Sequence, residues 1–72
     1  MDVSYNKLFK LLIDKEMKKT EFANAVGISA NTLAKLSRND TVSMDVIIKI
    51  CRYFNCTVDE IMEVLPETRI RK

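Results

Sequence analysis

The 72-residue sequence contains no histidine and no tryptophan, and it has only one glycine and one proline. With Gly27 and Pro66 as its only strong turn-forming residues, the chain has little of the turn chemistry that β-hairpins need. No run alternates apolar and polar residues over the length of a strand. Hydrophobic residues make up 47% and charged residues 31% of the chain, which is typical of a folded globular protein. The sequence therefore predicts an all-α fold with one hydrophobic core.

The absence of histidine also removes the commonest general base and metal ligand. Cys51 and Cys56 are five residues apart, and two thiols at that spacing do not resemble a zinc site, so we expect two small core or half-buried residues. Neither a glycine-rich phosphate loop nor a nucleophile elbow is present. We expect no enzymatic activity, no metal and no cofactor.

Long hydrophobic runs are absent as well. The longest are Leu11–Ile13 and Val46–Ile48, far short of a membrane span, and the N-terminus lacks the apolar core of a signal peptide. These features predict a cytoplasmic protein that makes no use of a membrane. We expect one domain over residues 1–66 and a basic tail over 67–72, either a frayed end, which we favour, or an arm that seeks phosphate.

Apolar residues recur at helical spacing in five segments, which predicts a compact five-helix bundle. The first helix is expected over residues 5–16, capped by Ser4, with Phe9 and Ile13 widening its packing face. The other four are expected from about residue 19 to 26, from 30 to about 37, from Ser43 to about Asn55 as the central core helix, and between Thr57 and Pro66.

Three of these boundaries carry specific capping signals. Gly27 can take the left-handed conformation that ends the second helix, and Ser29 is a strong N-cap for the third. Thr57 and Glu60 have the spacing of a capping box, which predicts that a fifth helix starts there.

Charge is placed unevenly along the chain, although the net charge is only +2. Residues 17–39 carry four cations (Lys18, Lys19, Lys35, Arg38) against Glu21, whereas residues 57–67 carry four acidic side chains (Asp59, Glu60, Glu63, Glu67) and no basic one. The first region suits a phosphate backbone and the second repels it.

The stretch from Lys19 to Leu36, KTEFANAVGISANTLAKL, combines a small residue where two helices touch, a glycine turn and inward apolar anchors. The small residue is Ala23, the turn is Gly27, and the anchors are Phe22, Ile28, Leu33 and Leu36. This pattern resembles the helix-turn-helix of the Cro and phage-repressor type, also called the xenobiotic-response-element family. The resemblance covers about residues 5–65, because one helix before the motif and two after it are also family features.

The resemblance implies a regulator, expected to be a repressor, that binds double-stranded DNA with its third helix in the major groove. Carried over by position, the base-reading residues would be Ser29, Ala30, Asn31, Thr32, Ala34 and Lys35. The DNA backbone would be held by Lys19, Thr20, Arg38, Asn39 and Ser43.

Two departures from the family pattern stand out. Lys18 occupies the place where the family often has a Ser or Thr cap before the second helix, so we expect that helix to start between Lys18 and Thr20. The sequence contains no glutamine, so base recognition would depend on few direct bonds together with DNA shape.

Members of this family often act as dimers on two-fold operators, so we expect a homodimer. Its interface is expected at Phe54, Ile61, Val64 and Leu65. The alternative is a protein-binding module, such as an antitoxin or antirepressor, because such proteins reuse this fold and fold does not fix function.

Overall fold

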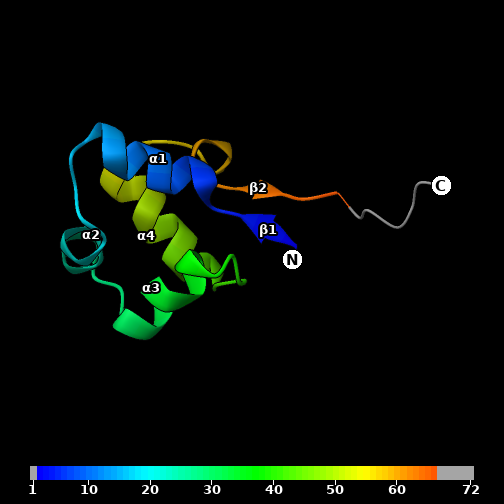
Figure 1. Ribbon diagram of the computed structural model, residues 1–72, viewed down its shortest axis with the longest axis horizontal. Coiled ribbons are helices and arrows are strands. Elements are labelled where there is room, and N and C mark those ends of the chain that lie inside the picture. The colour runs from blue at the N-terminus through cyan, green and yellow to red at the C-terminus, as the bar shows by residue number, and fades with distance from the viewer. Residues whose placement is uncertain (1, 67–72) are drawn as a thin grey trace.

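The computed structural model describes residues 2–66 (Figure 1). Over this range the chain forms four α-helices, one turn of 3-10 helix and a short antiparallel ladder. The elements in order are β1 (Val3–Ser4), α1 (Asn6–Asp14), α2 (Lys19–Val26), α3 (Ala30–Ser37), α4 (Met44–Phe54), η1 (Val58–Glu60) and β2 (Glu63–Val64). None of the described helices is long and apolar enough to cross a membrane.

The helices surround one hydrophobic core. In Figure 1, α4 lies between α1 and α3, and α2 lies beside them. The core draws on every helix and on both ends of the described chain, and its buried members are Val3, Tyr5, Leu8, Leu12, Phe22, Leu36, Ile47, Ile50 and Ile61. Removing these side chains from water is the main favourable contribution to folding.

The predicted helix between Thr57 and Pro66 is wrong. The capping box forms, since the Thr57 N–H donates to Glu60 Oε1 at 3.0 Å, but only one turn of 3-10 helix follows it. Ile61 then enters the core, and its carbonyl accepts a hydrogen bond from the Leu8 N–H at 3.1 Å. Pro66 therefore has no helix to end, and residues 2–66 form four α-helices where five were predicted.

The chain after Ile61 becomes strand β2, which pairs antiparallel with β1. Val64 lies opposite Val3 and Glu63 opposite Ser4. These strands were not predicted, because each has only two residues and its partner lies about 60 positions away in the chain. Pairing with a distant strand outweighed the local helical signal in this segment.

Two further details differ from the prediction for α1. Ser4 lies in β1 and not at the helix cap, although its hydroxyl accepts a hydrogen bond from the Asn6 N–H at 3.3 Å. Ile13 is 75% exposed and does not widen the packing face. In α4, Ile47 and Ile50 are buried, whereas Met44, Ile48 and Tyr53 are exposed, so this predicted core helix turns only one side toward the core.

The two cysteines lie at the end of α4 and are half-buried free thiols, as expected. Asn55 takes a left-handed conformation (φ 55°), and the Cys56 N–H donates to the Cys51 carbonyl at 3.0 Å. This closure satisfies carbonyl groups at the helix end and packs both thiols against the core.

Candidate DNA interface

The helix α2 starts where the sequence lacks a Ser or Thr cap. Lys18 holds the N-cap position in an extended conformation, and its backbone N–H donates to Glu21 Oε1 at 2.8 Å. Glu21 also sits in the first turn, where a negative charge is favoured by the helix dipole. A carboxylate from inside the helix thus supplies half of a capping box, and α2 begins at Lys19, within the predicted range.

The turn between α2 and α3 is made at Gly27. Its φ is 87°, a left-handed conformation that costs a residue with a Cβ about 1–2 kcal/mol. Its N–H and that of Ile28 both donate to the Ala23 carbonyl, at 2.9 and 3.0 Å. No atom lies within 4 Å of a Cβ built at Gly27, so the need for glycine comes from the backbone angle and not from crowding.

The first turn of α3 is fixed by its cap. Ser29 Oγ accepts a hydrogen bond from the Thr32 N–H and donates one to Thr32 Oγ1, both at 3.1 Å. The cap predicted from the sequence is confirmed. Because the two hydroxyls bond to each other, Ser29 and Thr32 hold the start of the helix in one conformation.

Beyond its cap, α3 buries one side and presents another. Leu36 is fully buried and Leu33 packs against the core. Ala30 and Asn31 are exposed in the first turn, while Ala34 and Lys35 are half-buried further along. Asn31, Ala34, Lys35 and Arg38 are three, four and seven positions apart, so they lie on one side of the helix. The structure thus brings the predicted base-reading residues together on a single short helix.

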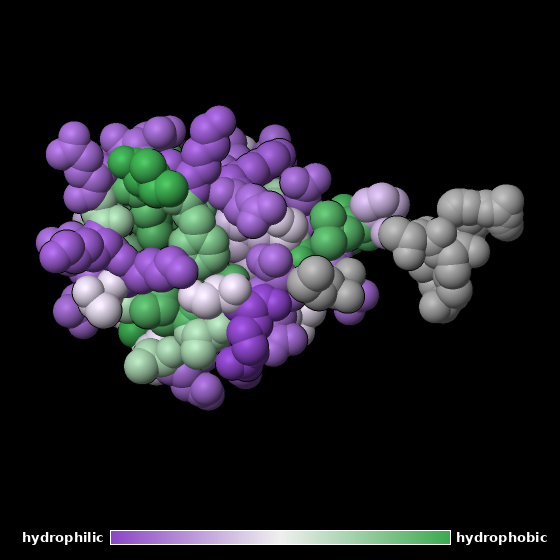
Figure 2. Space-filling view, viewed as in Figure 1, coloured by the Kyte–Doolittle hydropathy of each residue, from purple (hydrophilic) through white to green (hydrophobic). Residues whose placement is uncertain are grey.

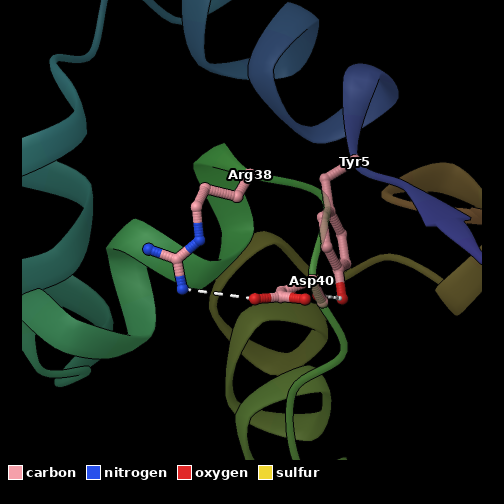
Figure 3. Close-up of polar contacts among 3 residues, drawn as sticks. All are labelled: Tyr5, Arg38 and Asp40. Carbon is pink, nitrogen blue, oxygen red and sulfur yellow. Dashed lines mark hydrogen bonds and ion pairs between the residues drawn. The ribbon is translucent and has the colours of Figure 1, made fainter. Parts of the chain in front are cut away.

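Arg38, at the C-terminal end of α3, is paired with an acidic residue. Its Nη2 donates to Asp40 Oδ2 at 3.2 Å, and the two side chains remain 59% and 58% exposed (Figure 3). The basic side chain remains accessible to solvent, but part of its hydrogen-bonding capacity is taken by Asp40.

Asn39 has a structural role, a hydrogen bond to Tyr5, that was not predicted from the sequence. Its φ is 59°, and its Oδ1 accepts a hydrogen bond from the Tyr5 N–H at 3.1 Å. The Tyr5 hydroxyl donates to the Asp40 carbonyl at 2.7 Å, so Tyr5 holds the segment after α3 from two sides (Figure 3). Burial, followed by the nearby Asp40 charge, raises the pKa of the Tyr5 hydroxyl above 10.0. The sequence predicted Tyr5 only as the first residue of a helix over residues 5–16.

The other predicted phosphate-binding residues lie at the starts of two helices. Lys19 is exposed at the beginning of α2, with its Nζ 4.6 Å from the centre of the Phe9 ring. Thr20 follows it and is exposed. Ser43 caps α4, as predicted, and its hydroxyl accepts from the Val46 N–H at 3.4 Å.

The four residues expected at a dimer interface have different environments. Ile61 is fully buried in the core and has no surface to offer a partner. Phe54 is half-buried and stacks on Phe22, with ring centroids 6.0 Å apart. Val64, by contrast, is 75% exposed on β2, and Leu65 is half-buried beside it. Figure 2 shows hydrophobic surface where β2 leaves the body of the molecule.

Comparison with known proteins places this geometry in a family. The model of the Cro/C1-type HTH DNA-binding domain matches residues 7–67, which is most of the chain. This chain belongs to that family. The match includes α2, Gly27 and α3 in full, so the Cro-type helix-turn-helix predicted from the stretch Lys19 to Leu36 is confirmed.

A crystal structure of the transcriptional regulator VanUg, in its form II, is similar to this Cro/C1-type domain throughout. It shares 56% sequence identity, has a TM-score of 0.86, and the match covers 92% of this chain and 88% of that one. Among curated protein sequences, none matches significantly. The Cro/C1-type domain is thus a DNA-binding, helix-turn-helix regulator of transcription.

Proposed function

We propose that this Cro/C1-type domain binds specific sequences of double-stranded DNA as a repressor, with α3 in the major groove. The observation that carries the proposal is that Asn31, Ala34 and Lys35 lie on one side of α3. The Ser29 cap fixes the start of this helix, and basic residues lie near both ends of the helix-turn-helix motif. A major groove about 12 Å wide admits one helix of this kind. In this proposal the bound sequence overlaps a promoter, and the bound domain represses by covering it.

Base recognition is proposed for the outward residues of α3. An asparagine amide can pair with adenine N6 and N7, and a lysine can donate to guanine O6 and N7, which suits Asn31 and Lys35. Ala30 and Ala34 are small enough to let the helix sit deep, and their methyl groups, or that of Thr32, suit thymine. Ser29 contributes through its cap, which orients the first turn.

The DNA backbone is proposed to contact basic side chains near α3 and the backbone amides at the N-termini of two helices. Lys19 and Arg38 supply positive charge, and the amides at the N-termini of α2 and α4, near Thr20 and Ser43, favour anions. Asn39 contributes by keeping the segment after α3 in place, because its Oδ1 already accepts from Tyr5. These contacts set orientation and affinity without reading sequence.

A homodimer is proposed to place two α3 helices on a two-fold operator. A single module of this size makes few base contacts, so two copies raise both affinity and specificity. The exposed Val64, with the half-buried Leu65 next to it in the chain, is the proposed contact. Phe54 stacks on Phe22 and Ile61 is fully buried, so these two residues are left out of the proposed contact. The proposed place of action is the cytoplasm of a bacterium, on chromosomal or phage DNA.

Selection of bound sequences from a random pool of DNA duplexes tests the proposal. A two-fold consensus with half-sites about 10 base pairs apart, or a multiple of that distance, is the expected result. Affinity for the consensus should fall steeply as salt rises, since cations that neutralise phosphates release counterions. No enrichment above the input pool, or binding that salt leaves unchanged, would favour an antitoxin-like or antirepressor-like protein module instead.

A further inference from the structure

The segment after α3 places a carboxylate next to a proposed phosphate contact. Asp40 Oδ2 lies 3.2 Å from Arg38 Nη2, and both side chains are more than half exposed. Arg38 is the last basic residue on the DNA-facing side of α3, so a negative charge at this distance weakens its attraction for a phosphate.

The position of Asp40 is imposed by the core. Tyr5, which is 1% exposed, donates from its hydroxyl to the Asp40 carbonyl at 2.7 Å. The Asp40 N–H donates to the Lys35 carbonyl at 2.9 Å. With both backbone groups bonded, the backbone of Asp40 is held at the end of α3, which keeps its carboxylate within reach of Arg38. Figure 3 shows its side chain lying between Tyr5 and Arg38.

Folding gains little from a carboxylate at this place. An exposed ion pair contributes about 0–1 kcal/mol to stability, and an acidic group near a helix C-terminus opposes the helix dipole. The Asp40 charge should therefore affect the binding of an anion to Arg38 more than it affects the stability of the fold.

We infer that Asp40 limits the DNA affinity of this domain by competing with a phosphate for Arg38. The inference rests on the proposed function. It states that Asp40 lowers the part of the DNA affinity that does not depend on base sequence. A phosphate that reaches Arg38 must replace the Asp40 carboxylate and then lie beside it. Because phosphate contacts are common to all sequences, this competition weakens binding to operator and random DNA by the same factor.

The Asp40→Asn variant tests this, since it removes the charge and keeps the backbone bonds to Tyr5 and Lys35. Affinity for the selected operator and for a random duplex should both rise by about two- to fivefold, which corresponds to the upper half of the energy range of an exposed ion pair. The salt dependence should steepen by up to about one counterion. Fluorescence anisotropy titrations at several salt concentrations measure both quantities.

Two matched variants separate this local effect from a change in total charge. Asp14→Asn removes an exposed carboxylate from the end of α1, which lies across the molecule from α3 in Figure 1. It should change affinity much less than Asp40→Asn. In an Arg38→Ala background, Asp40→Asn should lose most of its gain, because the competing cation is absent. Thermal melts check that all variants fold.

Equal gains for Asp40→Asn and Asp14→Asn would overturn the inference and leave the proposed function intact. A full gain in the Arg38→Ala background would overturn it too, because Asp40 would then act without Arg38. Failure of the unmodified protein to bind any duplex would overturn the proposed function itself.

Discussion

The hydroxyl of Tyr5 donates a 2.7 Å hydrogen bond to the carbonyl of Asp40, a residue 35 positions further along the chain. Tyr5 precedes α1 and follows β1, whereas Asp40 lies just beyond α3. This bond, with that from the Tyr5 N–H to Asn39 Oδ1, joins the N-terminal segment to the end of the helix proposed to read DNA. The first two predictions concern this connection.

Tyr5→Phe should destabilise the fold by about 1–2 kcal/mol, because it keeps the buried ring and leaves the Asp40 carbonyl without its donor. Urea denaturation followed by circular dichroism measures this. Tyr53→Phe is the matched control, since the Tyr53 side chain is 48% exposed and its substitution should cost much less. Equal losses for the two variants would contradict a structural role for the Tyr5 hydroxyl.

The free energy of unfolding should also decrease at alkaline pH, because the Tyr5 hydroxyl loses its proton. Its pKa in the folded protein is raised above 10.0 by burial and by Asp40, so the folded state holds the proton more tightly than the unfolded chain. That contribution is fully present below pH 10 and is lost as the pH rises through the folded pKa. The difference in unfolding free energy between the unmodified protein and Tyr5→Phe should therefore shrink above pH 10. A constant difference from pH 8 to 11 would show that Tyr5 does not cause the change.

Gly27→Ala should cost about 1–2 kcal/mol of stability through the backbone angle, since a Cβ at this site meets no other atom. Gly27→Asn should cost less, because asparagine tolerates the left-handed conformation and already adopts it at Asn39 and Asn55. Thermal or urea unfolding gives the order of the two. A larger loss for Asn than for Ala would point to a steric cause.

The proposed division of DNA contacts predicts two classes of variant. Asn31→Ala and Lys35→Ala should each cost about 1–3 kcal/mol on the selected operator and much less on random DNA. Lys19→Ala and Arg38→Ala should weaken binding to both and reduce the salt slope by about one each. Anisotropy titrations with the two duplexes at several salt concentrations measure this split. Equal losses on both duplexes for all four variants would remove the assignment of base reading to α3.

The proposed dimer predicts that Val64→Asp shifts the protein to monomer, because a charge would be buried in the contact between copies. Ile13→Asp is the matched control, since Ile13 and Val64 are both 75% exposed and lie on different elements. Sedimentation equilibrium over a range of concentrations measures the change, and Ile13→Asp should behave as the unmodified protein. A monomer at all concentrations, alone and on operator DNA, would contradict the dimer.

The helix-turn-helix was predictable because its signals are local. The Ser29 cap, the left-handed Gly27 and the spacing of the apolar anchors act within a few residues of one another, and the structure forms all of them. Glu21 lies three residues beyond the N-cap, but its bond to the Lys18 N–H was not predicted. The outward side of α3 followed from the same helical period.

What local signals left open depends on distant partners. Thr57 and Glu60 form their capping box, but the α-helix does not continue beyond it. Burial of Ile61 in the core and pairing of Glu63–Val64 with β1 decided the path of the chain there. The exposure of Ile13 and the bonds from Tyr5 to Asn39 and Asp40 depend likewise on what packs against each residue. The sequence by itself determined the start, turn and face of the DNA-binding motif, since capping and helical period are properties of neighbouring residues. Tertiary structure alone decided that β1 pairs with β2 and that Tyr5 holds Asn39 and Asp40, because those contacts join residues that only folding brings together.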